Sequence, residues 1–263
     1  MRKIVDAWWF TAPAPGNLGD ILTPIILDKV FDCDCNPIGS NMDDISRATK
    51  PFLISVGSTI SLGNELTAFW GTGIAGVDRK PHPKSRYLSV RGPRTRDLVK
   101  KNAGIDVPEI YGDPALLMPE AFTEEVEKTF QYGLVPHIHD VAAVSQFYKD
   151  NPDVTVISPL NADPFAVIRQ MLACEKILSS SLHGLIVSHA YGIPAAWVEH
   201  SNKVNGDGTK FHDYYESVGL ECIPGAFRET LPVSELSKFR FQHDIQIDMN
   251  PAKAALQEYL DEL

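Results

Sequence analysis

Short apolar segments alternate along the chain with turns rich in glycine, serine and proline. These segments, which predict strands, cover residues 4–10, 52–56, 68–70, 87–90, 132–135, 154–157, 177–178 and 195–198. Several end in small residues and are followed by stretches with helical spacing. Strands that recur with loops and helices between them are typical of a parallel sheet with both faces covered. The pattern therefore predicts an α/β protein.

Helical spacing of apolar residues is clearest in five places. The predicted helices cover residues 93–102, 141–148, 164–173, 182–191 and 251–263. Pro93 and Pro164 open two of them, at the first helical position, where a missing N–H costs nothing. The last helix is amphipathic, and we expect it to pack back across the junction between the two halves of the chain.

The strand and helix pattern pauses in an acidic stretch, residues 119–128, and resumes at Tyr132. A chain of 263 residues is long enough for two ordinary domains or one large one. We place a boundary in the acidic stretch. The prediction is an N-terminal Rossmann-like domain, residues 1–125, and a C-terminal Rossmann-like domain, residues 126–263.

The segment from Ser179 to His200 combines a strand end, a serine-rich loop, a helix and the next strand. The helix starts at Leu182 and is stopped by Gly192 and Pro194. In open α/β sheets, ligands bind beyond the carboxyl ends of strands, where the next helix points its free N–H groups at an anion. We therefore expect a ligand site around His183.

The two histidines of this helix differ in position. Leu182, Leu185, Ile186 and His189 share one helical face, which predicts that His189 is a core residue. His183 stands at the helix start among Ser181 and Gly184. A protonated imidazole there needs an anionic ligand or a carboxylate close by, because the positive end of the helix dipole disfavours it.

Two turns of the first half are further candidates. In residues 16–20, GNLGD, the glycines let the backbone approach a ligand closely, and Thr23 is expected to cap the following helix. A plain strand-to-helix turn is the alternative. The turn of residues 71–73, Gly-Thr-Gly, follows a strand end and is expected to line the cleft with Gly73.

Composition excludes several classes of protein. The net charge of −10 argues against nucleic-acid binding. Residues 79–101 carry a local excess of Lys and Arg, most of which a solvated helix face explains, while the remainder can attract an anionic substrate or lipid headgroups. No apolar run approaches the roughly 20 residues that span a bilayer, and a cytoplasmic protein is expected. The four cysteines are expected to be reduced, and no His, Cys or carboxylate spacing predicts a metal site.

Six short motifs together resemble the polysaccharide pyruvyl transferase family, and specifically its bacterial exopolysaccharide ketal-forming members. They are GNLGD at 16–20, SVRGPRT at 89–95, GDPALL at 112–117, PHIHD at 136–140, SSLHG at 180–184 and GDGTKFHDYY at 206–215. The resemblance covers nearly the whole chain. It implies a GT-B-like fold, in which two Rossmann-like domains face a cleft.

The resemblance also implies a reaction. An enolpyruvyl unit moves from phosphoenolpyruvate to two hydroxyls of one sugar in a lipid-linked repeat, which gives a cyclic pyruvate ketal without a metal or cofactor. His183 would act as the acid and Arg91 would bind the donor through its planar guanidinium. The resemblance places the donor in the C-terminal domain, beside Ser181, Leu182, Gly184, Lys210 and His137. The acceptor would lie on the N-terminal side, against Asn17, Asp20 and Gly73.

Some roles stay open at this point. The candidates for the base that accepts the hydroxyl protons are Asp20, Asp113, His137 and His139, and a capping or structural role is the alternative for each of them. Lys210 follows a glycine-containing loop, residues 204–209, that is either a mobile lid or a simple surface loop. Peripheral contact with the inner membrane is compatible with a lipid-linked acceptor.

Two other functions compete with this one. A nucleotide-sugar glycosyltransferase of the same two-domain build would need a carboxylate for the ribose hydroxyls, a role that Glu199 can fill. A non-catalytic component of a polysaccharide assembly complex is the alternative from another class. The sugar, the hydroxyl pair, the ketal stereochemistry and the oligomeric state are not predicted.

Overall fold

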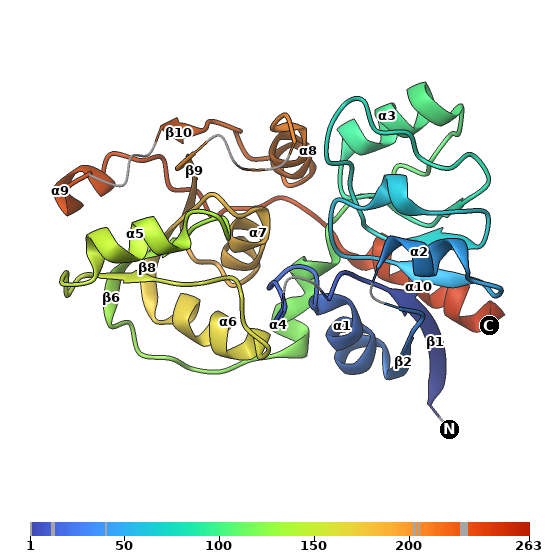
Figure 1. The fold of residues 1–263 in the computed structure, drawn as a ribbon, viewed down its shortest axis with the longest axis horizontal. Coiled ribbons are helices and arrows are strands. Elements are labelled where there is room, and N and C mark those ends of the chain that lie inside the picture. The colour runs from blue at the N-terminus through green and yellow to red at the C-terminus, as the bar shows by residue number, and fades with distance from the viewer. Residues whose placement is uncertain (1, 12–13, 40, 202–203, 205, 227–230) are drawn as a thin grey trace.

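Two five-stranded sheets organise the chain (Figure 1). The computed structural model describes residues 2–11, 14–39, 41–201, 204, 206–226 and 231–263. The strand orders are β2-β1-β3-β4-β5 and β10-β9-β8-β6-β7, and neighbouring strands within both sheets are parallel. The predicted α/β class with parallel sheets is confirmed.

The first sheet is built from short strands. Its strands are β1 (Lys3–Trp8), β2 (Cys33–Pro37), β3 (Phe52–Ile54), β4 (Thr67–Phe69) and β5 (Arg86–Tyr87). Its helices are α1 (Leu22–Phe31), α2 (Met42–Ser46) and α3 (Pro93–Ala103), with a 3-10 turn η1 (Ile60–Leu62). The strands β3 and β4 are buried at every position, because both faces of this sheet are covered.

The second sheet repeats this architecture. Its strands are β6 (Phe130–Val135), β7 (Val154–Val156), β8 (Cys174–Ser179), β9 (Ala195–Glu199) and β10 (Gly225–Ala226). Its helices are α5 (Val141–Tyr148), α6 (Pro164–Leu172), α7 (Leu182–Ala190), α8 (Thr209–Ser217) and α9 (Val233–Leu236). The predicted segment of residues 179–200 forms the end of β8, α7 and β9, as its pattern indicated.

A shared core joins the two sheets. Two short elements connect them, η2 (Pro114–Leu117) and α4 (Met118–Ala121), and η2 packs against α7. One continuous hydrophobic cluster includes Val5 of β1 and Val135 of β6. Each sheet also has a smaller hydrophobic cluster of its own, and the two-domain division and the GT-B-like arrangement stay predictions.

The C-terminal helix α10 (Asn250–Glu262) lies against the first sheet (Figure 1). The indole N–H of Trp70, at the end of β4, donates to the carbonyl of Ala252 at 2.7 Å. Arg86 of β5 forms an ion pair with Glu262. The last residues of the chain therefore cover strands that are formed by the first ninety.

The prediction for Thr23 is wrong. Helix α1 begins at Leu22, and its N-cap residue Ile21 makes no side-chain capping bond. The Thr23 hydroxyl instead accepts the backbone N–H of Val56 at 3.3 Å, so it ties α1 to the end of β3.

All four cysteines are free thiols. Within the described residues, every helix is too short or too polar to cross a bilayer.

Candidate functional site

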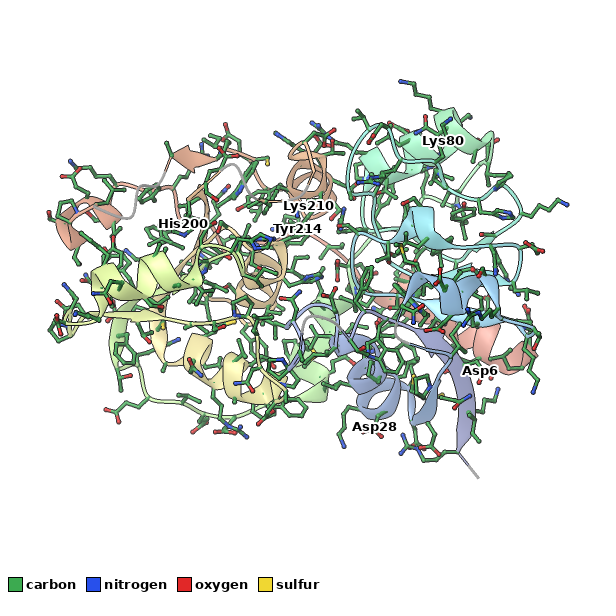
Figure 2. The ribbon with its side chains drawn as sticks, viewed as in Figure 1. Asp6, Asp28, Lys80, His200, Lys210 and Tyr214 are labelled. Carbon is green, nitrogen blue, oxygen red and sulfur yellow. The ribbon has the colours of Figure 1, made fainter. Side chains whose placement is uncertain are left out.

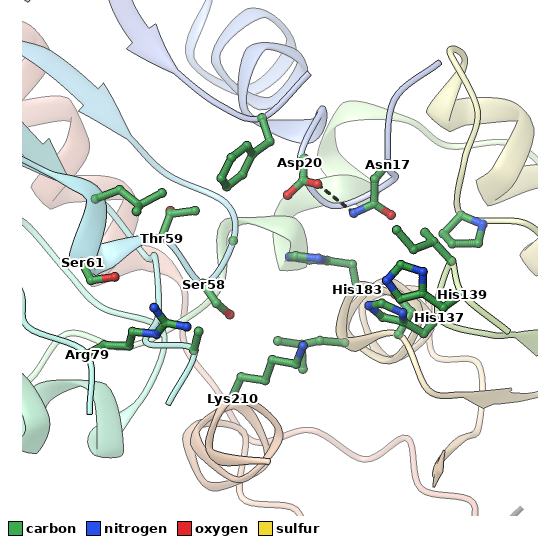
Figure 3. A pocket seen from close by; sticks show the side chains of 18 residues that line it. Asn17, Asp20, Ser58, Thr59, Ser61, Arg79, His137, His139, His183 and Lys210 are labelled. Carbon is green, nitrogen blue, oxygen red and sulfur yellow. Dashed lines mark hydrogen bonds between the residues drawn. The ribbon is translucent and has the colours of Figure 1, made fainter. Parts of the chain in front are cut away.

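A pocket of about 460 Å³ opens where loops from both sheets meet (Figure 3). Its walls come from segments beyond the carboxyl ends of the strands, where α/β proteins bind ligands. The size suits a small organic ligand. The residues of the wall are Phe10, Asn17, Asp20, Gly57, Ser58, Thr59, Ser61, Leu62, Ala75, Arg79, His137, Ile138, His139, Pro159, Ser181, Leu182, His183 and Lys210.

The N-terminus of α7 brings three predicted donor-side residues into this wall. Ser181 is the N-cap residue, and Leu182 and His183 form the start of the first turn. The first N–H groups of a helix have no partner within the helix, so this turn can bind an anion. Gly184 does not line the pocket. A Cβ there would lie 2.3 Å from the Ser179 hydroxyl oxygen, so this glycine is needed for packing.

The imidazole of His183 is held from two sides. A Cβ on Gly19 would lie 1.8 Å from Nδ1 of His183, so the backbone of the GNLGD turn approaches the ring closely. On the other side, Nε2 is 3.8 Å from Oδ2 of Asp113. The glycine predicted to admit a ligand therefore admits the ring of His183. Sequence reasoning missed this contact, because Gly19 follows a strand of the first sheet and His183 follows a strand of the second.

Lys210 extends into the pocket from the first turn of α8 (Figure 3). Figure 2 shows it near the middle of the molecule, close to Tyr214 of the same helix. Burial, followed by the charge of Arg91, lowers the pKa of Lys210 to about 8, although Asp20 opposes the shift. Lys210 is a helical residue and not part of a loop; Asn205 of the predicted 204–209 loop lies outside the described residues.

Asp20 and Asn17 stand on the opposite wall of the pocket (Figure 3). The Asn17 side-chain amide donates to Oδ2 of Asp20 at 2.9 Å. Burial raises the pKa of Asp20, while the hydrogen bond from Asn17 and the charges of His183 and Lys210 lower it. The raised pKa makes this carboxylate a better proton acceptor than an exposed aspartate.

His137 and His139 complete the wall that the second sheet provides. Their ring centroids are 5.0 Å apart, and the backbone N–H of His137 donates to the Ser180 hydroxyl at 2.8 Å. Burial, followed by the charges of Lys210 and His139, lowers the pKa of His137 to about 4. His137 is therefore a neutral hydrogen-bonding residue near pH 7 and not a cation.

The structure does not place Arg91 at the pocket surface. Its side chain is 0% exposed, and Nε donates to Oδ2 of Asp213 at 3.0 Å. The remaining guanidinium nitrogens donate to the Ser58 hydroxyl at 2.8 Å and to the Ile74 carbonyl at 3.1 Å. The expected direct contact of Arg91 with the donor needs correction, because the guanidinium is buried and paired with Asp213.

Gly73 likewise lies beneath the pocket wall. A Cβ on Gly73 would be 2.1 Å from the guanidinium carbon of Arg91. The glycine leaves room for the buried arginine, so the expected acceptor contact is replaced by an indirect effect. Through Arg91, this turn supports Ser58, which does line the pocket.

Several pocket residues were not singled out from the sequence. Arg79 supplies a guanidinium to the wall, with its side chain 54% exposed and an ion-pair distance of 4.0 Å to Asp78. Its signal was the local excess of Lys and Arg. The wall of the first half also contains the hydroxyls of Ser58, Thr59 and Ser61.

His189 is a core residue, as its place on the apolar face of α7 predicted. Its Nδ1 is 2.9 Å from the hydroxyl of Tyr214, and burial lowers its pKa to about 4.

In the part of the chain that the structure describes, no group of three or more His, Cys, Asp or Glu side chains is arranged to hold a metal ion.

Comparison with known proteins shows which proteins this chain is similar to. The structure of UDP-GlcNAc 2-epimerase from Methanocaldococcus jannaschii aligns over 98% of this chain and 100% of that chain, with a TM-score of 0.47 and 12% identity. The uncharacterised protein L143 of Acanthamoeba polyphaga mimivirus is 32% identical over 217 residues, which are 78% of this chain and 72% of the viral protein. Residues 17–202 match the family model described as polysaccharide pyruvyl transferase. The chain belongs to the polysaccharide pyruvyl transferase family.

Proposed function

We propose that the protein transfers an enolpyruvyl unit from phosphoenolpyruvate to two hydroxyls of a sugar in a lipid-linked glycan. The observation that carries this proposal is His183 in the first turn of α7, in a pocket that also holds Lys210 and Arg79. A doubly anionic donor needs cations and free N–H groups, and this wall offers both.

The donor's two anionic groups have separate binding groups in this scheme. The phosphate lies at the N–H groups of the α7 first turn, within reach of Lys210. The carboxylate pairs with Arg79, whose planar guanidinium can bind it through two hydrogen bonds. Arg79 thereby takes the role first expected of Arg91. Arg91 supports the site from below through Ser58.

The chemistry begins with proton transfer. His183 gives a proton to the methylene carbon, C2 gains oxocarbenium character, and the first sugar hydroxyl attacks C2. Asp20 accepts the proton that this hydroxyl loses, a role that its raised pKa favours. The bond between C2 and the phosphate oxygen then breaks, and inorganic phosphate leaves. The second hydroxyl attacks C2, gives its proton to the released phosphate, which becomes hydrogen phosphate, and closes the ketal ring.

The acceptor faces the first half of the pocket. Ser58, Thr59 and Asn17 offer hydroxyl and amide groups that can hydrogen-bond a sugar, and Phe10 offers an apolar face. The scheme uses no metal and no redox cofactor. A lipid-linked acceptor would place the reaction in the cytoplasm, at the inner face of the membrane.

Calorimetry with phosphoenolpyruvate tests the donor. Wild-type protein should bind it, and Lys210→Met should weaken binding by about 1.5 to 3 kcal/mol, because a buried charge-assisted contact is lost. Lys238→Met is the matched control. Lys238 follows α9, which lies at the outer end of the second half (Figure 1), and it forms an exposed ion pair with Glu235.

The same titrations with nucleotide sugars test the nearest competitor. Glu199, the carboxylate that a glycosyltransferase would use, lines a separate cavity beside Trp197 and His212. Binding of a nucleotide sugar that Glu199→Gln weakens, without binding of phosphoenolpyruvate, would favour the glycosyltransferase. Equal affinity of wild type and Lys210→Met for phosphoenolpyruvate would show that Lys210 does not contact the donor.

A further inference from the structure

We infer that Asp113 is a positioning residue for His183, which it holds with Nε2 protonated and turned inward so that Nδ1 exchanges the proton with the substrate. This inference rests on the proposed function of His183. It assigns a role to a carboxylate that does not line the pocket, and it specifies which nitrogen of the imidazole acts.

Asp113 is fixed at the junction between the two sheets. Its side chain is 0% exposed, and it caps η2 by accepting the backbone N–H of Ala115 at Oδ1, at 3.0 Å. The second oxygen, Oδ2, is buried and makes no hydrogen bond to any of the residues that the structure describes. A buried carboxylate oxygen normally has a donor, because its loss of water must be compensated.

The unpartnered oxygen of Asp113 faces an unpartnered nitrogen of His183. Among the described parts of the chain, Nε2 of His183 is also buried without a hydrogen bond, and it lies 3.8 Å from Oδ2 of Asp113. A small rotation of the imidazole would shorten this separation to a hydrogen bond. Catalytic hydrogen bonds are often long in structures without substrate and shorten when substrate binds.

The backbone of Gly19 limits how far the ring can move the other way. Nδ1 of His183 occupies space that any side chain at position 19 would fill, since a Cβ there would lie 1.8 Å from it. The ring is therefore confined between Gly19 and Asp113. The GNLGD turn and the GDPALL segment, which are far apart in sequence, act on one imidazole.

The protonation states follow from the chemistry of the partners. An ionised carboxylate only accepts hydrogen bonds, so Nε2 must carry the proton of the Asp113 contact. Nδ1 is then the nitrogen that gives its proton to the methylene carbon. The carboxylate also stabilises the imidazolium before transfer, which offsets the unfavourable helix dipole at the start of α7.

Asp113→Asn tests the inference. The amide keeps the size and the oxygen that accepts the Ala115 N–H, but it removes the charge and can present a donor to Nε2. We expect kcat to fall by about 10² to 10⁴ while KM and Kd for phosphoenolpyruvate change less than about threefold, as for loss of an orienting carboxylate behind a catalytic histidine.

Asp163→Asn is the matched control. Asp163 also precedes a proline and caps its helix, α6, by accepting the N–H of the residue two positions on, Phe165, at 2.9 Å. It does not line the pocket. A general effect of weakening an Asp-Pro cap would therefore appear in Asp163→Asn as well, and we expect its kcat to equal that of wild type.

Imidazole ¹⁵N NMR gives a readout that does not depend on turnover. The His183 signals, assigned by their loss in His183→Gln, should show Nε2 protonated in neutral wild type and a shift toward Nδ1 protonation in Asp113→Asn. Unchanged signals in Asp113→Asn, or kcat within about twofold of wild type, would overturn the inference. Full turnover by His183→Gln would instead reject the catalytic role of His183.

Discussion

Arg91 and Asp213 form an ion pair of 3.0 Å in which neither side chain is exposed. The pair joins the segment after β5 to helix α8, which carries Lys210. Thr95, at the start of α3, adds two hydrogen bonds to the same carboxylate. Figure 1 shows α3 and α8 on the facing sides of the two halves. The position of Lys210 in the pocket therefore depends on contacts beneath the wall.

Removing Arg91 should destabilise the protein. Arg91→Met leaves Asp213 buried without its cation, which should lower the free energy of unfolding by about 3 to 5 kcal/mol, measured by urea denaturation. Arg94→Met is the control, because Arg94 of α3 pairs with Glu216 of α8 nearby and these two side chains are 42% and 40% exposed. It should cost less than about 1 kcal/mol. Equal decreases in the free energy of unfolding of the two variants would show that the buried pair stabilises the protein no more than the exposed one.

Gly19→Ala should impair turnover more than folding. The new methyl group would displace the His183 ring, so we expect kcat to fall by about 10² or more, as for loss of a general acid. Gly76→Ala is the control, since a Cβ there comes no closer than 3.3 Å to its neighbours. Circular dichroism and melting temperature should remain near wild type for both. Normal kcat in Gly19→Ala would mean that the ring moves aside without loss.

Affinity for phosphoenolpyruvate should fall as the pH rises above about 8. The lowered pKa of Lys210, about 8, means that its cation is present below this pH and is lost above it. The phosphate of the donor is already fully ionised there, so each further pH unit should weaken binding by up to about tenfold. Calorimetry between about pH 7 and 9 measures the slope. Lys210→Met should bind weakly with a flat profile, and a flat wild-type profile would place the lysine outside the anion site.

His189→Ala should cost stability and leave the chemistry intact. The substitution opens a cavity on the core face of α7 and removes the partner of the buried Tyr214 hydroxyl. We expect the free energy of unfolding to fall by about 2 to 4 kcal/mol. kcat per folded molecule should match wild type, in contrast to His183→Gln on the same helix. A loss of kcat in the folded fraction of His189→Ala would contradict the division of roles between the two histidines.

Local patterns predicted the parallel architecture and the start of the site well. The strand-loop-helix-strand reading of residues 179–200 is observed, because apolar runs, serines and the Gly192 stop act over short distances. Strand β2 was missed, since the residues Cys33–Pro37 contain no apolar run and form an edge of the sheet. Edge strands need less apolar surface than central ones.

Long-range partners explain the remaining errors. Arg91 stands at a strand end, as a ligand-binding residue would, but its carboxylate partner lies 122 residues further on. The approach of Gly19 to His183 and that of Asp113 to the same ring also cross between the sheets. Sequence patterns identify which residues stand at strand ends. They do not show which of those side chains satisfy one another and which remain for a ligand.

The proposed transfer is tested most directly by incubating the protein with phosphoenolpyruvate and fractionated lipid-linked glycans in D₂O, followed by phosphate assay and mass spectrometry. We expect phosphate release in step with a glycan that gains a pyruvate ketal. The ketal methyl should carry one deuterium, because the acid delivers a solvent-derived proton to the methylene carbon. His183→Gln should retain less than about a tenth of this turnover. Absence of any ketal with every glycan fraction would contradict the proposed transfer and favour a non-catalytic component of an assembly complex.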